Sequence, residues 1–430
     1  MKSPTEDTNR NIALFINELP QKYLVALPKL SKKLGRPLSV VLLIDTIQYA
    51  KRKNSLDNQN QYKVAVVNFN DDTELQEAVK PFQNNLLLVA CPLEKSQLYF
   101  KRIIPHIPYV NTPTEYSIDL STDKGKMRQA LLDYDISISP KAITVYDASP
   151  KTIVTVCTSF KFPVITKPTN LASSRLVSNV ENEEELHSVL TKSFKTLDKI
   201  YSKYRNYGDA TMVVEEFVEG KLYSTDVYIN AQGKVYVLPF NRFFNGTAAG
   251  AKSFQVYQGE TFHTLSKEEE RLGRIVVRKA IHAVGLRSSV AHIELFHQGN
   301  SWKIIELGAR PGGWRQEMYQ LSYGIDHAFN ELLIKVGLEP EMPSSIDTYV
   351  TTFSVHAPKA GMLESITGLE EVRAHPNLYK LLVKPSIGEK VEPSTEGGSP
   401  IIDGLMYHED VDQLNQLIQY ARSAIKVTVK

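Results

Sequence analysis

The sequence predicts a mixed α/β (α+β) fold in which a parallel α/β region precedes antiparallel hairpins. Up to about residue 120, short apolar runs alternate with polar, helix-like stretches, as parallel strands alternate with crossover helices. Beyond residue 212, alternating runs are joined by short turns, as in antiparallel hairpins. The chain has 430 residues. At about 150 residues per domain, this length predicts two to four domains.

The N-terminal region is expected to hold four strands, separated by a helix-like stretch at 71–82 and a polar loop at 51–61. No G-x-G-x-x-G motif follows any of these runs, so the usual dinucleotide fingerprint is missing. The expected strands are 39–45, 62–69, 85–91 and 107–111.

The middle of the chain reads as a helix from 123, with Ser121 or Asp123 as its cap, followed by three strands and a long amphipathic helix. Those strands are 141–147, 154–157 and 162–168, and the helix is 181–204. A hairpin with a turn at 230–234 comes next, then a helix at 267–285 closed by Gly285, a second hairpin at 288–308 and a final helix near 409–426.

Composition narrows the class of protein. The chain is 42% hydrophobic and 23% charged, with a net charge of +2 from 50 basic and 48 acidic residues, so it carries no global signal for nucleic acid. The first residues, MKSPTEDTNRN, contain acids and no apolar core, and no apolar run approaches the roughly 18 residues of a membrane span. With only two cysteines, Cys91 and Cys157, the sequence predicts a cytoplasmic protein.

The second hairpin brings two acids together. A turn at 298–300 places Glu294 nearly opposite Glu306, and two carboxylates opposite each other on one face repel unless a cation lies between them. Mg²⁺ often binds through one or two carboxylates plus substrate phosphates, so the pair predicts a magnesium–nucleotide site. The alternative is that the acids face opposite sides, or that each pairs with a nearby Lys or Arg. Arg310, in a glycine-rich turn, has a planar fork suited to phosphate or carboxylate.

Four stretches in order resemble the ATP-grasp superfamily of carboxylate–amine ligases. DKGKMRQALLDYDISISP (123–140) resembles the entry to its central domain, and FPVITKP (162–168) its strand with a phosphate-binding lysine. VVEEFVEGKLYSTDV (213–227) resembles its adenine hinge, and HIELF with IIELGARPGG (292–313) its metal glutamates and arginine. GARPGGW and the tail VHAPKAGMLESITGLEEV are similar to the L-amino-acid ligase (dipeptide synthetase) branch.

The resemblance implies an ATP-grasp fold of four parts. These are an N-terminal parallel α/β domain at 1–120, a central lid domain at 121–212, a catalytic antiparallel domain at 213–342 and a small C-terminal lobe at 343–430. It also implies ATP with Mg²⁺ (or Mn²⁺) as cofactors and small-molecule carboxylate and amine substrates. It allows a homodimer.

The resemblance assigns roles residue by residue. Arg310, Lys167 and Glu306 are the expected catalytic residues, and Glu294 and Glu306 the metal ligands. Glu215 would accept from the adenine amino group. The full expected nucleotide set is Lys126, Lys167, Ser173, Ser174, Arg175, Glu215, Glu216, Phe217 and Val218, and the expected substrate set is Arg242, Gly312, Gly313 and Trp314.

Ordinary readings compete with several of these roles. Lys167 could be a lysine whose stem lies on apolar surface, and Glu215 and Glu216 could be surface acids at a strand end. Arg242 belongs to a stretch that could be a plain connection, and Trp314 could anchor helix packing.

The chain departs from the family pattern in three places. The lid stretch 169–177 has no glycine, Leu222 stands where a ribose-binding polar residue is usual, and Gly308 replaces an asparagine that would ligate metal.

The function that follows is ATP-dependent formation of an amide between a carboxylate and an amine, at least one of them an amino acid. An acyl phosphate would be the intermediate, and ADP and phosphate the products. Another ATP-grasp activity on a small metabolite, or a non-catalytic ATP-binding module, are the alternatives.

Overall fold

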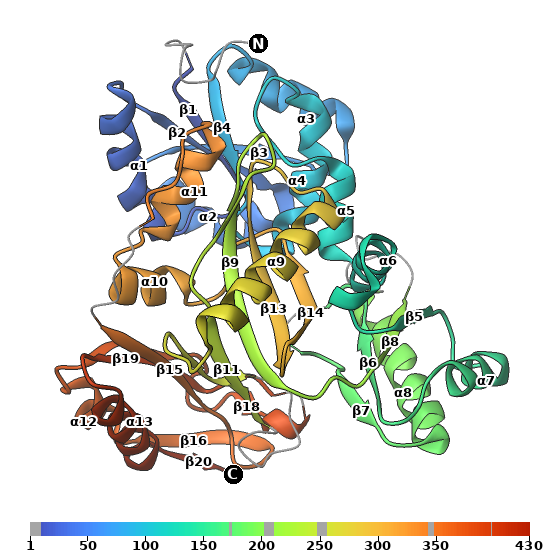
Figure 1. Cartoon of the computed structure of the whole chain (residues 1–430). Coiled ribbons are helices and arrows are strands. Elements are labelled where there is room, and N and C mark those ends of the chain that lie inside the picture. The colour runs from blue at the N-terminus through green and yellow to red at the C-terminus, as the bar shows by residue number, and fades with distance from the viewer. Residues whose placement is uncertain (1–9, 172–173, 202–209, 247–255, 343–347, 397) are drawn as a thin grey trace.

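The computed structural model describes residues 10–171, 174–201, 210–246, 256–342, 348–396 and 398–430. Figure 1 shows an N-terminal α/β unit at the top, a long antiparallel sheet through the centre, a small α/β unit to one side and a C-terminal lobe at the bottom. None of the helices in these ranges combines the length and apolar character needed to cross a membrane.

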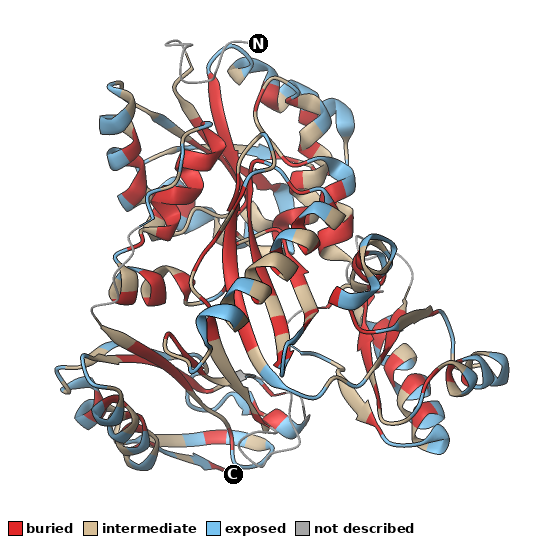
Figure 2. Cartoon of the chain, in the orientation of Figure 1, coloured by how far each residue is buried: buried red, intermediate tan, exposed pale blue. Residues whose placement is uncertain are grey.

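The N-terminal unit is a parallel four-stranded sheet in the order β3-β2-β1-β4, as the alternation of apolar runs and helices predicted. Strands β1, β2 and β4 are largely buried (Figure 2), because helices cover the sheet, whereas the edge strand β3 buries only Val67. The strands are β1 (Ile12–Ile16), β2 (Ser39–Asp45), β3 (Lys63–Val67) and β4 (Leu86–Ala90). The helices are α1 (Gln21–Leu34), α2 (Thr46–Asp57), α3 (Asp72–Val79) and α4 (Gln97–Ile103), with 3₁₀ turns η1 (Lys80–Phe82), η2 (Glu94–Ser96) and η3 (Ile104–His106).

Some of the local predictions were wrong. Most of the expected loop at 51–61 belongs to α2, whose N-terminus is capped by Asp45 and which buries only Leu56, so it lacks a strong apolar period. The expected strand at 107–111 is an irregular turn, and β1 was not predicted. The expected strand at 154–157 lies inside a helix, because Ser149 and Pro150 form a helix start that the β-branched run concealed.

The small unit beside the central sheet has its own antiparallel sheet, in the order β5-β8-β6-β7. Its strands are β5 (Ala142–Val145), β6 (Val164–Pro168), β7 (Ser178–Val180) and β8 (Met212–Glu216). Its helices are α7 (Pro150–Ser159) and the predicted amphipathic helix α8 (Glu183–Tyr201). The chain enters it through α5 (Glu115–Thr122), α6 (Lys124–Tyr134) and η4 (Ile136–Ile138).

The central sheet has nine strands in the order β14-β13-β9-β11-β12-β15-β19-β17, with β10 paired to β9. Both predicted hairpins are present, as β9–β10 and β13–β14. The strands are β9 (Lys221–Ile229), β10 (Val235–Val237), β11 (Asn241–Asn245), β12 (Val256–Glu260), β13 (Ser289–Gln298), β14 (Ser301–Gly308), β15 (Tyr349–Val355), β17 (Leu378–Val383) and β19 (Ile402–His408).

Helices cover both faces of this sheet. The predicted helix α9 (Lys267–Val284), closed by Gly285, packs Val277 and Ile281 into the core on one face. On the other face lie α10 (Arg315–Tyr323) and α11 (His327–Lys335). Because α11 also packs beside α1 into the core of the N-terminal unit, it joins that unit to the central sheet.

The C-terminal region is not a separate block, since three of its strands extend the central sheet. The remainder forms a small sheet in the order β18-β16-β20, with the predicted final helix packed on it. These elements are β16 (Gly361–Thr367), α12 (Leu369–Arg373), β18 (Lys390–Val391), η6 (Ser394–Glu396), α13 (Val411–Ala424) and β20 (Lys426–Val429). The four domain boundaries proposed above stay a prediction.

Candidate active site

The second hairpin holds the two glutamates on one face of the sheet. Glu294 of β13 is paired directly with Glu306 of β14, as predicted from the turn at 298–300. Cross-strand partners share a face, so the two carboxylates point to the same side. The register shifts beside this pair, and the extra residue, Ile305, leaves Ile304 facing the core on the opposite side.

Both carboxylates are accessible, and each has a basic side chain nearby. Their side chains are 32% and 34% exposed. Glu294 lies 3.4 Å from Nε2 of His292, and Glu306 lies 3.3 Å from Nζ of Lys124. The alternative that each acid has a local partner therefore holds in part, although neither contact is close.

A buried ion cluster lies directly beside Glu306. Arg128 of α6 donates to both oxygens of Glu215, at 2.5 and 3.1 Å, and Lys167 of β6 lies 2.9 Å from the same carboxylate. Arg128 also donates to the carbonyls of Ile304 and Ile305, at 2.6 and 2.7 Å. The bulge in β14 thus turns two carbonyls toward Arg128, and the cluster joins the small unit to the central sheet.

This cluster changes the role expected for Glu215. Its carboxylate is buried and held by two cations, so it anchors Lys167 and is not an open acceptor for an adenine amino group. The alternative for Lys167, a stem on apolar surface with an exposed ammonium, does not hold, because the whole side chain is buried. Burial lowers the pKa of Lys167 to about 8, against the opposing effect of Glu215.

Arg310 is held by a carboxylate from the N-terminal unit. Its Nε lies 2.5 Å from Oε2 of Glu94, which belongs to η2, and its Nη1 donates to the carbonyl of Pro311 at 3.1 Å. The Glu94 carboxylate also fills the space in front of Gly308, where a Cβ atom would stand 3.0 Å from Oε2. Gly308, where the family resemblance implies an asparagine, therefore lies next to the Glu94 carboxylate. Glu94 is 216 residues away from Arg310 in the sequence.

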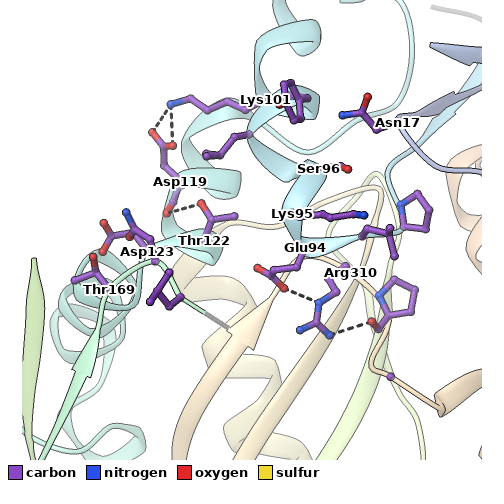
Figure 3. Close-up of a pocket in the computed structure, with 18 of the residues that line it drawn as sticks. Asn17, Glu94, Lys95, Ser96, Lys101, Asp119, Thr122, Asp123, Thr169 and Arg310 are labelled. Atoms are coloured by element: carbon purple, nitrogen blue, oxygen red, sulfur yellow. Dashed lines mark hydrogen bonds and ion pairs between the residues drawn. The ribbon is translucent and has the colours of Figure 1, made fainter. Parts of the chain in front are cut away.

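These residues surround a large open cavity of about 2310 Å³, lined by the N-terminal unit, the small unit and the turn after β14 (Figure 3). A small adjoining pocket contains Lys124, Glu306 and Glu94. Of the expected site residues, the large cavity is lined by Lys126, Arg175, Arg310, Gly312, Gly313 and Trp314. Among the described residues, no group of three or more His, Cys, Asp or Glu side chains could hold a metal ion.

Comparisons with known proteins agree with this geometry. Residues 160–317 match the ATP-grasp domain family, and residues 354–430 match the family described as L-amino acid ligase C-terminal domain 2. The chain thus contains an ATP-grasp domain, followed by a C-terminal domain of the L-amino acid ligase type. The C-terminal match is to the branch that the sequence resembles, the L-amino acid ligases. No curated protein matches the sequence.

Solved structures of similar fold cover almost the entire chain. An L-amino acid ligase from Bacillus licheniformis superposes with a TM-score of 0.78 at 17% identity, covering 98% of this chain and 99% of its own. An N5-carboxyaminoimidazole ribonucleotide synthetase from Thermotoga maritima gives 0.68 at 16% identity, covering 98% and 100%. A phosphoribosylglycinamide synthetase from Anaerococcus prevotii gives 0.64 at 17% identity, with the same coverage. At these identities the likeness establishes the fold.

Beside the ATP-grasp glutamates lies a lysine that the motifs did not predict. Lys124 contacts Glu306 and donates to the carbonyl of Leu171 at 2.8 Å, whereas the predicted Lys126 is exposed at the cavity wall. Positions 124 and 126 point about 200° apart on a helix, so only one can face the glutamates. The Asp123 cap, which fixes where α6 begins, was the available signal.

The hinge and lid residues are only partly described. The Phe217 side chain is 39% exposed, with Val218 partly buried beside it. Glu216 accepts from the backbone N–H of Lys141 at 3.0 Å. Ser174 and Arg175 are exposed in the lid stretch, and Ser173 lies outside the described residues.

Arg242 does not face this site. It is paired with Tyr223 across β11 and β9, and Tyr223 is paired with Leu295. The Glu294 partner on β9 is the next residue, Ser224, so Glu294 and Arg242 lie on opposite faces of the sheet. The expected role of Arg242 in substrate binding loses its support because strand alternation turns it away. Arg315 takes a place on the site face instead, donating to Oγ of Ser224 at 2.8 Å.

Trp314 fits both readings that the sequence left open. It lines the cavity, where Lys380 stands 5.3 Å from its ring centre, and it also packs on a small core that includes Met318. Its backbone is left-handed, with φ of 60°, which is strained for a bulky residue and is a feature of functional sites.

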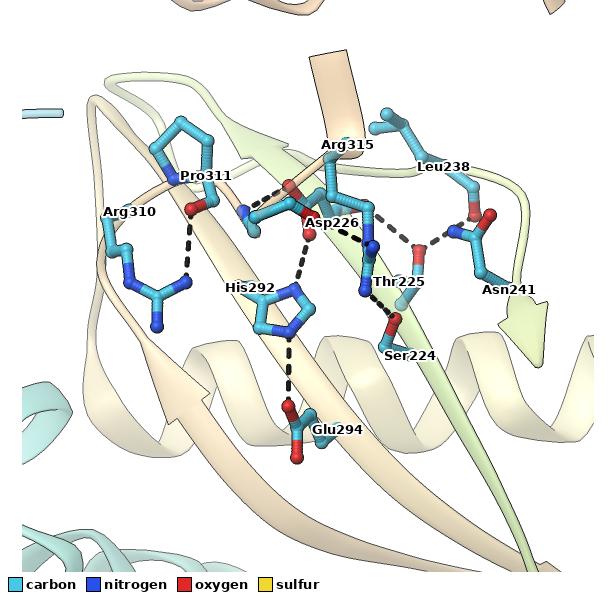
Figure 4. A network of polar contacts seen from close by, with 12 residues as sticks. Ser224, Thr225, Asp226, Leu238, Asn241, His292, Glu294, Arg310, Pro311 and Arg315 are labelled. Carbon is cyan, nitrogen blue, oxygen red and sulfur yellow. Dashed lines mark hydrogen bonds and ion pairs between the residues drawn. The ribbon is translucent and has the colours of Figure 1, made fainter. Parts of the chain in front are cut away.

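A buried polar network supports Glu294 and the turn that carries Arg310 (Figure 4). Asp226 of β9 is fully buried and accepts three hydrogen bonds: from Nδ1 of His292 (2.7 Å), from Nε2 of His327 (2.7 Å) and from the backbone N–H of Gly312 (2.8 Å). Burial alone would raise the pKa of Asp226, but the two histidines lower it well below its usual value. The carboxylate of Asp226 on β9 is thus hydrogen-bonded to β13, α11 and the Gly312 turn.

The two glycines of this turn differ in what they allow, which gives a matched pair of variants. A Cβ at Gly312 would stand 2.6 Å from Nδ1 of His292 and 2.7 Å from Cγ of Arg315, whereas one at Gly313 would meet nothing within 4 Å. We expect Gly312→Ala to lower the free energy of unfolding by about 1–3 kcal/mol through overpacking. We expect Gly313→Ala to change it by less than about 0.5 kcal/mol. Urea unfolding measures both, and equal effects of the two variants would contradict this packing.

Proposed function

We propose that the protein joins a carboxylate to an amine at the expense of ATP, with an amino acid as at least one substrate. An acyl phosphate is the intermediate, and ADP and phosphate are released. The observation that carries the proposal is the pair Glu294 and Glu306, accessible on one face of the sheet beside Lys124, with Arg310 at the adjoining cavity. The matched ATP-grasp domain supports the nucleotide.

The donor set fits a divalent cation that arrives with phosphates. Within the described residues these two carboxylates do not form a group of three or more metal-binding side chains, which suits Mg²⁺, since it keeps only one or two carboxylate ligands and takes the rest from water and phosphate. Mg²⁺, or Mn²⁺ in its place, would supply neutralisation of phosphate charge there. Glu294 and Glu306 would hold it.

The chain's own residues then provide position and charge. Phosphoryl transfer to a carboxylate needs charge neutralisation, with little covalent help from the protein. Lys124 and Lys167 lie on the side of Glu306 that faces the small unit, where the phosphates would be bound. Arg310, fixed by Glu94, would stabilise the anion that develops at the acyl carbon. The backbone and side chains of 216–218 would bind adenine.

Lys167 gives this proposal a pH dependence. Because its pKa is about 8, it loses its positive charge above that pH, and with it the attraction for phosphate. We expect kcat/KM for ATP, which reports the free enzyme, to fall as pH rises through about 8. Lys167→Arg keeps its charge and is expected to remove that fall. The same decline in both enzymes would show that another group titrates.

The function is tested by incubating the protein with Mg-ATP and pools of amino acids, amines and small acids, then following ADP and new masses. ADP formation together with a new amide supports the proposed ligase. ADP without an amide points to another ATP-grasp activity on a metabolite carboxylate. Nucleotide binding with no turnover in any pool points to a regulatory module and would overturn the proposal.

A further inference from the structure

The cavity extends away from the glutamates into a crevice of the N-terminal unit. From β1 the chain moves outward through β2 to β3, and then returns to the other side of β1 as β4. The order of strands therefore reverses between β1 and β4. In open parallel sheets, ligands bind at the carboxyl ends of the strands at such a point.

The residues that follow these two strands line the cavity. Asn17 and Glu18 follow β1, and Pro92 to Ser96 follow β4 (Figure 3). Asn17 has a left-handed backbone, with φ of 59°, and is buried, and its side-chain oxygen accepts from the backbone N–H of Asp45 at 2.8 Å. Asparagine tolerates this conformation better than other non-glycine residues, and here it fixes the turn that forms the mouth of the crevice.

The charges of this crevice are unbalanced. The Glu18 carboxylate is neutralised by Arg52 at 3.1 Å and by Lys95 at 3.0 Å. Asp45 caps α2 through the N–H of Ile47. Two further lysines line the same wall, Lys22 from the first turn of α1 and Lys51 from α2. The Lys22 ammonium lies 5.4 Å from the ring centre of Tyr23, and neither lysine has an ion pair within the described ranges. The crevice therefore offers free positive charge to an anion.

The crevice is continuous with the catalytic face. Glu94, at the carboxyl end of β4, lies in the same wall and contacts Arg310 directly. The residues proposed to hold the nucleotide lie on the opposite side, toward the small unit. A group that enters from the N-terminal unit would reach the acyl carbon without crossing the phosphates.

We propose that this crevice binds an anionic side chain of the amine substrate, a side-chain carboxylate or a phosphate ester, held by Lys22 and Lys51. The proposal rests on the proposed ligase function, and it assigns an acidic class to the amine. Asn17 and Lys95 shape the wall, and the amino group of the substrate points toward Arg310.

Pairs of amino acids that share the α-carboxylate but differ in the charge of the side chain test this proposal: glutamate against glutamine, aspartate against asparagine and phosphoserine against serine. Binding of each to the full-length protein is measured by calorimetry without ATP, so that the result does not depend on turnover. We compare wild type with the double variant Lys22→Gln/Lys51→Gln. The control is Lys32→Gln/Lys53→Gln, which removes the same charge from exposed positions of α1 and α2 outside the cavity.

We expect wild type and control to bind the acidic member of a pair more tightly. The Lys22/Lys51 variant is expected to lose that preference by about 10- to 100-fold and to bind the neutral member unchanged. A preference for phosphoserine identifies a phosphate ester, and a preference for glutamate or aspartate a carboxylate. Equal binding of acidic and neutral members by wild type, or a preference that survives in the Lys22/Lys51 variant, would overturn the proposal. Failure to form an amide from any acceptor would count against the ligase function only.

Discussion

Replacing Glu306 with glutamine is expected to lower the rate of ADP formation by about 100- to 1000-fold, the effect of removing one electrostatic contact to a transition state. Glutamine keeps the shape of the side chain but removes the charge that would bind a cation between β13 and β14. Glu294→Gln is expected to act similarly, because the two residues are direct cross-strand partners.

The fold should survive this change. The Glu306 side chain is one-third exposed, and its contact with Lys124 is 3.3 Å, so the free energy of unfolding should change by less than about 1 kcal/mol. Glu77→Gln, at an exposed position of α3, is a control for the loss of one acid. If Glu306→Gln turned over ATP at the rate of this control, Glu306 would not be part of the catalytic machinery.

Replacing Asp226 with alanine is expected to lower the free energy of unfolding by about 3–5 kcal/mol, the cost of breaking a buried ion pair. Its carboxylate is fully buried, and the change leaves the facing groups of His292, His327 and Gly312 without their acceptor. Turnover should fall as well, because the Gly312 turn carries Arg310. Thermal and urea unfolding, with activity measured on the folded fraction, check both effects.

Asp226→Asn separates the contribution of the negative charge to stability from that of the hydrogen bonds. The amide oxygen can still accept from one donor while the negative charge is lost, so its effect on stability should be smaller than that of alanine. Identical losses for asparagine and alanine would show that charge, and not hydrogen bonding, dominates. A loss below about 1 kcal/mol for alanine would contradict the network.

Local patterns predicted the parts of the site that depend on spacing along the chain. The turn at 298–300 brought Glu294 and Glu306 nearly opposite each other, because hairpin register follows from turn length. Turn length alone would pair Glu294 with Ile305, and the extra residue in β14 moves Glu306 into register with it. The bulge at Ile305, which turns two carbonyls to Arg128, has no signal in an apolar run of β-branched residues.

Contacts between segments that are distant in the sequence could not be predicted from local patterns. Glu94 meets Arg310 across 216 residues, and His327 meets Asp226 across 101, so neither pair leaves a periodic trace in the sequence. For Arg242 the prediction was wrong. Its position between the two hairpins in the sequence suggested that it binds substrate, but the pleat of β11 places its side chain on the other face of the sheet. Strand alternation decides the face only once the register is known.

Transfer of an oxygen atom tests the central claim, activation of a carboxylate by ATP, most directly. With the substrates found in the pools, the carboxylate is labelled with ¹⁸O, and the phosphate released is examined by mass spectrometry. An acyl phosphate requires one labelled oxygen to move from the carboxylate to phosphate for each amide formed. Phosphate that carries no label while amide accumulates would contradict the account.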